Sequence, residues 1–163
     1  MSRSGYRDAA EKTKSQAHQE NERRKRILVV EDNQLSLALV KQLLEAYGYE
    51  ILGTPEGLKA IDIARDKQPD LILMDIGLPD ICGLDVTRVL KQDDQTKAIP
   101  IIAVTALATP EYEKKSLESG CDAYIAKPII VENLLRTVDS FLSPLPPIAI
   151  AVMPSSETEP GSA

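Results

Sequence analysis

The sequence has one histidine, His18, and no tryptophan. Because His18 lies in a polar stretch near the N-terminus, histidine general bases, histidine-ligated metals and a phosphohistidine are excluded from the apolar middle of the chain. The two cysteines, Cys82 and Cys121, stand far apart and form no CxxC pair. This spacing excludes a disulfide framework and a zinc site, and it predicts that both cysteines are packing residues.

Long apolar runs and an excess of positive charge are also missing. No stretch approaches the roughly 18 apolar residues of a membrane helix, and the polar N-terminus lacks signal-peptide character. The formal net charge of −6 argues against a nucleic-acid partner. We interpret the basic run 22–26 as a solvated flank, with a weak contact to an acidic partner as the alternative. A cytoplasmic protein without membrane contact is therefore expected.

The two ends of the chain differ in composition from its middle. Residues 1–25 show almost no apolar periodicity, and residues 143–163 hold five of the eleven prolines. We predict a disordered polar N-terminal extension, one domain over 26–142 and a disordered proline-rich C-terminal tail. The apolar run IAIAVM (148–153) in the tail is alternatively a docking strip.

Short aliphatic runs alternate with segments of helical spacing through the middle of the chain. The predicted strands cover 26–31, 49–53, 70–75, 99–105 and 122–127. The predicted helices cover 35–47, 55–66, 84–92, 110–119 and 131–142. Strands that are aliphatic on both faces indicate a parallel sheet covered on both sides. With right-handed crossovers this is an α/β fold, a doubly wound five-stranded parallel sheet with five helices.

Capping signals mark several of the helix ends. Thr54-Pro55-Glu56 and Thr109-Pro110-Glu111 each combine an N-cap hydroxyl, a proline at the first helical position and an early acid. Gly48 and Gly120 follow two predicted helices at positions where a left-handed residue is favoured. We therefore expect helices to begin after both threonines and to stop at both glycines.

Polar residues end four of the predicted strands. In chain order they are Glu31, Asp32, Asp75, Thr105 and Lys127. Because the carboxyl ends of parallel strands share the edge where ligands bind, these side chains should converge. Two unit charges about 4 Å apart at an effective dielectric of about 20 interact by roughly 4 kcal/mol, so three converging acids need a counter-charge.

A hard divalent cation supplies that counter-charge, and an oxygen-only ligand set suits Mg²⁺. The candidate ligands are Asp32, Asp75 and the Gly77 carbonyl, with Glu31 acting through water. A lysine and a threonine facing the acids indicate phosphate chemistry rather than calcium storage. The pattern predicts that Asp75 accepts a phosphoryl group, with Lys127 and Thr105 contacting its oxygens.

Taken singly, these residues also have ordinary structural interpretations, as a turn acid, a strand threonine and a surface lysine. Their joint placement at one edge favours function. Two other classes stay open: a Mg²⁺-dependent phosphohydrolase with an aspartyl nucleophile, and an adaptor that no longer takes phosphate. Gly77 stands where the phosphohydrolase would have its general acid, which counts against that class.

Four motifs resemble those of response regulator receiver domains, the CheY-like superfamily. They are VVEDN (29–33), LILMDIGLP (71–79), AVTA (103–106) and YIAKPI (124–129). LLEAYGYE, DLILMDI, GLDVT and GCDAYIAKPI further resemble the DivK-like group of single-domain cell-division regulators. The resemblance spans about 26–142 and implies a flavodoxin-like strand order of 2-1-3-4-5.

The resemblance also implies roles. Asp75 is then the phosphoacceptor, Thr105 and Tyr124 are the switch residues, and Lys127 precedes a cis bond to Pro128. Mg²⁺ is the implied cofactor, held by Glu31, Asp32, Asp75 and the Gly77 carbonyl. The implied partners are a sensor histidine kinase or histidine phosphotransfer protein, and a downstream regulator on the face of the fourth helix, fifth strand and fifth helix. The chain is then a switch, whose only catalysis is its own phosphotransfer and slow autodephosphorylation.

Two departures from the family pattern stand out. Cys82-Gly83 replaces the Asp-Gly of many receivers, outside the phosphate shell, and we expect little effect. Gly77, which with Leu107 flanks the path of the attacking water in the family, offers no side chain, so the phosphoryl lifetime stays open. The segment after Leu142 is too short for a DNA-binding domain. Output by protein contacts of a monomer or weak dimer is therefore expected.

Overall fold

The computed structural model describes residues 23–143. The predicted disorder of the two ends and the IAIAVM run therefore concern segments that lie almost wholly outside the described residues. Within them, strands and helices alternate. The elements are β1 (Arg26–Val30), α2 (Gln34–Ala46), β2 (Glu50–Thr54), α3 (Gly57–Lys67), β3 (Leu71–Asp75), α4 (Gly83–Gln92), β4 (Ile101–Thr105), α5 (Pro110–Glu118), β5 (Ala123–Ala126) and α6 (Val131–Leu142).

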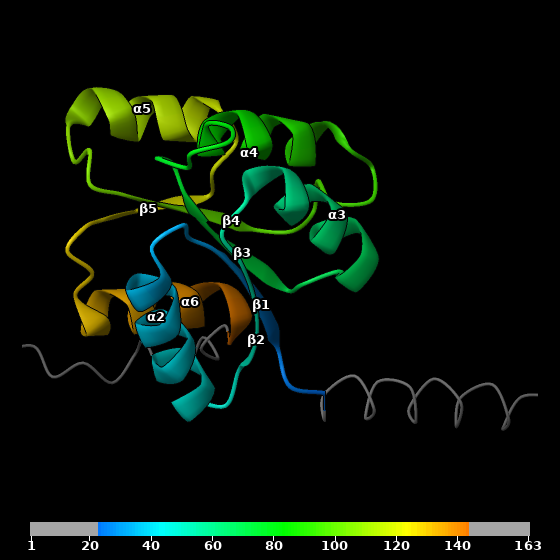
Figure 1. The fold of residues 1–163 in the computed structure, drawn as a ribbon, viewed down its shortest axis with the longest axis vertical. Helices are drawn as coiled ribbons and strands as arrows, with labels where there is room; N and C mark the ends of the chain where they lie inside the picture. Colours follow the sequence, from blue (N-terminus) through cyan, green and yellow to red (C-terminus); the bar gives the residue numbers. More distant parts are fainter. Residues whose placement is uncertain (1–22, 144–163) are drawn as a thin grey trace, which may run out of the picture.

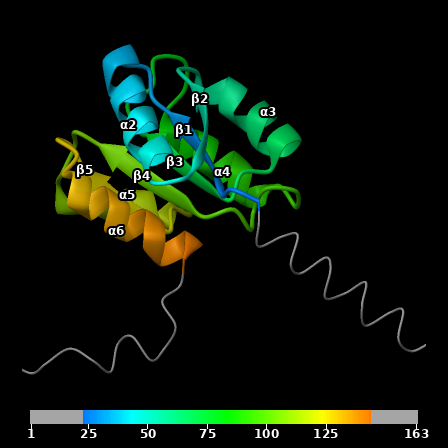
Figure 2. The same ribbon diagram turned by 90° about the horizontal axis from the view of Figure 1, so that it is seen from below.

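The strands form one parallel sheet in the order β2-β1-β3-β4-β5, which confirms the predicted fold and strand order. Helices α2 and α6 cover one face, and α3, α4 and α5 cover the other (Figures 1 and 2). Strands β3 and β4 are buried along their whole length because helices cover them on both sides. Their continuous aliphatic runs reflect that double burial.

Each face of the sheet has its own apolar cluster. One gathers Leu28, Ile72 and Ile101 against α3 and α4, and the other gathers Ile27 and Ile102 against α2 and α6. Side chains of successive strand residues point to opposite faces, so a single aliphatic strand feeds both clusters. The sheet is thereby fixed as a rigid platform for the residues at its two edges. No helix of the described residues is long and apolar enough to cross a membrane.

Three of the predicted helix ends are confirmed. Thr109 is the N-cap of α5, and its side chain accepts a hydrogen bond from the Tyr112 N–H at 3.4 Å. Gly48 (φ +93°) and Gly120 (φ +102°) follow α2 and α5 in the left-handed region. A residue in that region suits the turn after a helix, where a side chain would be strained.

The predicted cap at Thr54 is wrong. Thr54 is the last residue of β2, and α3 begins at Gly57 with Glu56 in the N-cap position. The free N–H groups of Gly57 and Leu58 donate instead to the Asp80 carboxylate, at 3.1 and 3.0 Å. The N-terminus of α3 is therefore capped from the loop after β3, and these backbone hydrogen bonds lower the pKa of Asp80.

The two cysteines differ in environment. Cys121 is buried, as predicted, and burial raises the pKa of its thiol. Cys82 is exposed, so its predicted packing role is wrong. It occupies the N-cap position of α4, where its side chain makes no capping hydrogen bond.

Candidate functional site

The carboxyl edge of the sheet brings three of the predicted residues into direct contact. Glu31 follows β1 and Asp75 ends the neighbouring β3, so their carboxylates lie next to each other. Lys127 follows β5 and reaches across the end of β4. Its Nζ lies 2.7 Å from Glu31 Oε2 and 3.2 Å from Asp75 Oδ2. One ammonium is thus shared by two carboxylates from different strands.

Both of these carboxylates are buried. Glu31 and Asp75 are 5% and 7% exposed, whereas the Lys127 side chain is 24% exposed. Burial raises the pKa of Glu31, which the hydrogen bond from Lys127 only partly opposes. Burial lowers the pKa of Lys127, but the hydrogen bond to Glu31 and the charge of Asp75 outweigh it, so that pKa is raised overall. Lys127 is therefore an ammonium at neutral pH.

Asp32 completes an oxygen cluster at this edge. One carboxylate oxygen from each of Glu31, Asp32 and Asp75 lies within 4.8 Å of the others, and Asp32 is exposed. Three carboxylates facing one ammonium leave a surplus of two negative charges. An oxygen-only set with an exposed member fits Mg²⁺, which binds one or two carboxylates and keeps several waters. The residues present therefore fit the predicted metal.

The loops after β1 and β3 each donate a backbone hydrogen bond to one of the buried carboxylates. Asp75 Oδ1 accepts a hydrogen bond from the Gly77 N–H at 3.0 Å, and Glu31 Oε1 accepts one from the Asn33 N–H at 3.1 Å. A Cβ on Gly77 would meet only Asp75 Oδ1 at 3.8 Å, which is an ordinary contact. Glycine at 77 is therefore not required by packing in this structure.

Gly83 has a stricter role, which the sequence analysis missed. A Cβ at this position would stand 2.1 Å from the Asp75 carbonyl oxygen, and the Gly83 N–H donates to the Ile76 carbonyl at 3.0 Å. The start of α4 thus packs directly on the backbone of the strand end that carries the central acid. The sequence does place a glycine at the first turn of a predicted helix, which hints at a close approach. Periodicity alone does not predict that the Asp75 backbone is what the glycine approaches.

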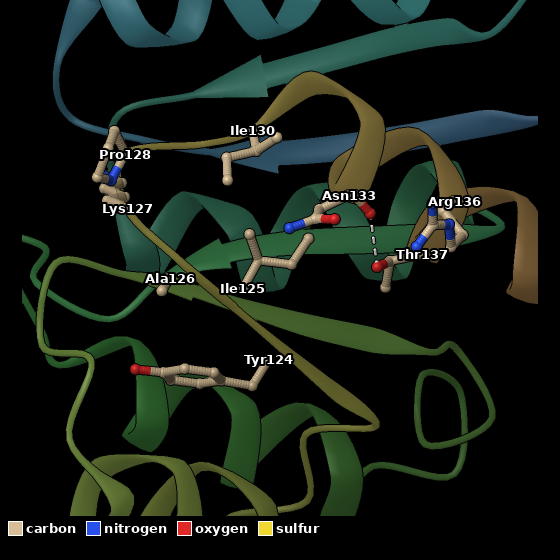
Figure 3. Close-up of a pocket in the computed structure, with 9 residues that line it drawn as sticks. All are labelled: Tyr124, Ile125, Ala126, Lys127, Pro128, Ile130, Asn133, Arg136 and Thr137. Atoms are coloured by element: carbon tan, nitrogen blue, oxygen red, sulfur yellow. Dashed lines mark hydrogen bonds between the residues drawn. The ribbon is translucent and has the colours of Figure 1, made fainter.

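Thr105 and Tyr124 are both tied to the β4–α5 loop through Leu107. The buried Thr105 hydroxyl accepts a hydrogen bond from the Leu107 N–H at 3.0 Å. The Tyr124 hydroxyl donates to the Leu107 carbonyl at 2.5 Å. Figure 3 shows Tyr124 on the opposite side of β5 from Ile125. The structure therefore links these two predicted switch residues to each other through one loop residue.

The backbone around Lys127 fixes where its side chain starts. The Lys127 N–H donates to the Thr105 carbonyl at 2.8 Å, which extends the pairing of β4 with β5 by one residue. The Lys127–Pro128 peptide bond is cis, as the family resemblance implied. Figure 3 shows both residues at the end of the strand, before the turn into α6.

Comparison with known proteins agrees with this geometry. The family model of the response regulator receiver domain matches residues 27–139 of the sequence. The polar-differentiation response regulator DivK of Brucella anthropi is 50% identical over 118 residues, which cover 72% of this chain and 96% of that protein. DivK of Brucella ovis is 49% identical over the same length and shares of the two chains.

Solved structures show the same fold. The chemotaxis protein CheY4 of Vibrio cholerae superposes with a TM-score of 0.70 at 25% identity, covering 73% of this chain and 99% of that one. The receiver domain of a sensor histidine kinase from Pseudomonas aeruginosa superposes with a TM-score of 0.69 at 31% identity, covering 74% of this chain and 98% of that one. The latter structure has a magnesium ion coordinated in its active-site cleft. On its fold, its family match and its relatives, this chain belongs to the response regulator receiver domains of two-component signalling.

Proposed function

We propose that this protein is a phosphorelay switch whose phosphoacceptor is Asp75. The observation that carries the proposal is the contact of one ammonium, Lys127 Nζ, with the two buried carboxylates of Glu31 and Asp75 at the carboxyl edge. Buried acids that share one cation are costly unless a further positive charge offsets them. Metal-assisted transfer of a phosphoryl group to one of these acids accounts for the whole set.

The reaction transfers a phosphoryl group from a histidine nitrogen of the donor to a carboxylate oxygen of Asp75. A carboxylate oxygen of Asp75 forms the new P–O bond while the P–N bond to the donor's histidine breaks, and the imidazole leaves with a proton from solvent. Lys127 then exchanges a carboxylate contact for a phosphoryl oxygen, because its flexible stem lets the ammonium follow the negative charge. Glu31, Asp32, Asp75 and the Gly77 carbonyl would hold Mg²⁺, which supplies charge neutralisation when bound.

Phosphorylation would change the conformation of the β4–α5 loop, which both Thr105 and Tyr124 contact through Leu107. A phosphoryl oxygen near Thr105 competes with the Leu107 N–H for its hydroxyl. If that hydrogen bond is exchanged, Leu107 is released and the Tyr124 contact to its carbonyl is disturbed. The loop then has one arrangement in the unphosphorylated protein and another in the phosphorylated protein. The change between them alters the face of α5, β5 and α6 that partners contact.

The similarity to regulators named for polar differentiation supports a narrower proposal. This chain would receive its phosphoryl group from a histidine kinase or phosphotransfer protein and act in the control of cell differentiation or division. Gly77 argues against the phosphohydrolase alternative, because it has no side chain to serve as a general acid. The complete set of acids and lysine argues against an adaptor that takes no phosphate.

The test is phosphorylation by a small donor such as acetyl phosphate, followed by intact mass. We expect one phosphoryl adduct that requires Mg²⁺ and disappears in Asp75→Asn. Asp70→Asn is the matched control, because Asp70 immediately precedes the strand that Asp75 ends. An adduct that persists in Asp75→Asn, or no adduct on the wild-type chain that binds Mg²⁺, would contradict the proposal.

A further inference from the structure

An apolar groove lies between α2 and α6, beside the site. Leu39, Val40 and Leu43 of α2 form one wall, and Val131 and Leu134 of α6 form the other; Ser36, Lys127, Pro128 and Ile129 complete the lining. Its volume is about 320 Å³. Figures 1 and 2 both show α2 and α6 next to each other on one face of the sheet. We call this feature the α2–α6 groove.

Large apolar side chains are exposed around the α2–α6 groove. Leu39 is 68% exposed, Val131 is 48% exposed, and the neighbouring Leu35 and Ile130 are 83% and 60% exposed. The one cation in its lining, Lys127, directs its ammonium to the carboxylates of the site. Single exposed apolar residues need no explanation, whereas a group of them beside a hollow indicates a surface that something covers.

The chain itself has an apolar segment shortly after α6 in the sequence. Helix α6 ends at Leu142, and residues 148–153 (IAIAVM) follow after a short proline-rich linker, 143–147 (SPLPP). These residues lie outside the described part of the chain and outside the family match at 27–139. Its β-branched residues Ile148, Ile150 and Val152 alternate with Ala149, Ala151 and Met153, and β-branched residues favour an extended backbone.

The lengths agree with a return of the chain along α6. From Leu134 to Leu142 the helix rises by roughly 12 Å, at about 1.5 Å per residue. A proline-rich linker of this size extends by roughly 15 Å, at about 3.1 Å per residue. If the chain reverses after Ser143, the apolar segment therefore arrives level with the groove.

We propose that residues 148–153 occupy the α2–α6 groove of their own chain. Aliphatic side chains then meet an aliphatic lining, and the exposed apolar residues of α2 and α6 are covered. A short linker gives the segment an effective concentration in the millimolar range, so a weak contact is enough to populate the bound state. The proposal concerns binding alone and does not depend on phosphate transfer to Asp75.

The test is methyl NMR on the full chain with labelled isoleucine, leucine and valine methyl groups. We expect nuclear Overhauser contacts from Ile148 and Ile150 to Leu39 and Val131. The double substitution Ile148→Asp with Ile150→Asp should remove these contacts and shift the groove methyl signals. Leu39→Glu, at an exposed position, should have the same effect on the segment.

The matched control is Ser155→Asp with Ser156→Asp, which adds the same charge to the tail and should leave the contacts unchanged. Three results would overturn the proposal. The groove methyl signals could be identical in the wild type and the double aspartate variant. The contacts could instead lie at the hollow beside β5, shown in Figure 3. The contacts could also depend on protein concentration, which would assign the segment to a second copy of the chain.

Discussion

The two edges of the sheet use acids in opposite ways. At the amino edge, Asp70 precedes β3 and accepts a hydrogen bond from the first N–H of β1, that of Arg26, at 2.7 Å. Asp122 precedes β5 and accepts one from the Ile101 N–H of β4 at 2.8 Å. Each has its own cation: Arg23 pairs with Asp70 at 3.2 Å, and Lys91 pairs with Asp122 at 2.9 Å.

At the carboxyl edge no such balance exists among the described residues. Glu31 and Asp75 are buried and share Lys127, and Asp32 adds a third carboxylate. Acids therefore stand at both edges of the sheet, and at both ends of β3, but Asp70 and Asp122 at the amino edge each have a cation of their own. The site is distinguished by negative charge that its protein neighbours leave unbalanced, and such a surplus favours a bound cation.

The largest expected effect concerns Mg²⁺ affinity. Asp75→Asn should weaken Mg²⁺ binding by about a hundredfold or more, because a ligand charge about 4 Å from a cation is worth several kcal/mol at an effective dielectric of about 20. The same change at Asp70, in Asp70→Asn, should leave the affinity within about twofold at moderate salt, where charges this far apart are screened. Calorimetric titration measures both. Equal losses in the two variants would remove the distinction between the edges.

The second effect concerns stability and should have opposite signs at the two edges. Asp122→Ala leaves the N–H of the fully buried Ile101 without its acceptor, and should lower the free energy of unfolding by about 2 kcal/mol. Asp75→Asn, measured without Mg²⁺, should raise the free energy of unfolding. The reason is repulsion between carboxylates: after burial, the charge of Asp75 is a cause of the raised pKa of Glu31, and the substitution removes that charge. Urea unfolding monitored by circular dichroism tests both. A loss of stability in both variants would contradict this contrast.

Much of this architecture follows from the sequence, because it depends on local pattern. Aliphatic runs and helical spacing predict the elements, and the polar residues at the strand ends predict which side chains meet. Gly48 and Gly120 are predictable because a left-handed turn constrains the residue that occupies it. The contact of Lys127 with Asp75 is a direct consequence of strand order.

The remaining features depend on contacts between distant segments. Asp80 caps α3 from another loop, so the Thr54 signal was overridden by a partner that the local sequence does not contain. Gly83 is required by a carbonyl oxygen of Asp75, and Cys82, unlike Cys121, lies outside the packed core. These contacts form only when loops from distant parts of the sequence pack together. Composition and periodicity do not describe that packing.

The third prediction concerns the closure of the amino edge by Tyr49. The Tyr49 hydroxyl donates to Asp139 Oδ1 of α6 at 2.5 Å, so Tyr49→Phe should cost about 1 kcal/mol of unfolding free energy at pH 7. Burial and then Asp139 raise the pKa of Tyr49 to about 12 from 10.0. In the unfolded chain the phenol ionises first, so the wild type should lose stability relative to Tyr49→Phe as the pH rises from 10 towards 12.

Urea unfolding of both proteins at pH 7 and at two alkaline values gives the comparison. Tyr47→Phe is the matched control, because Tyr47 is 60% exposed. Equal stability of the wild type and Tyr49→Phe at pH 7 would show that the contact to Asp139 carries no net free energy. A difference that stays constant up to pH 12 would instead exclude the proposed titration of Tyr49.

The smallest effect separates the two kinds of contact that Asp70 makes. The Arg23 side chain is 51% exposed, so its ion pair with Asp70 should be screened by solvent and salt. Arg23→Ala should therefore change the unfolding free energy by less than about 0.5 kcal/mol, and the change should vanish at high salt. Asp70→Ala should cost more at every salt concentration, because it also leaves the Arg26 N–H without its acceptor. If both variants lost equal stability at low salt and recovered it at high salt, the amino edge would be held by charge alone. Its contrast with the carboxyl edge would then be one of degree.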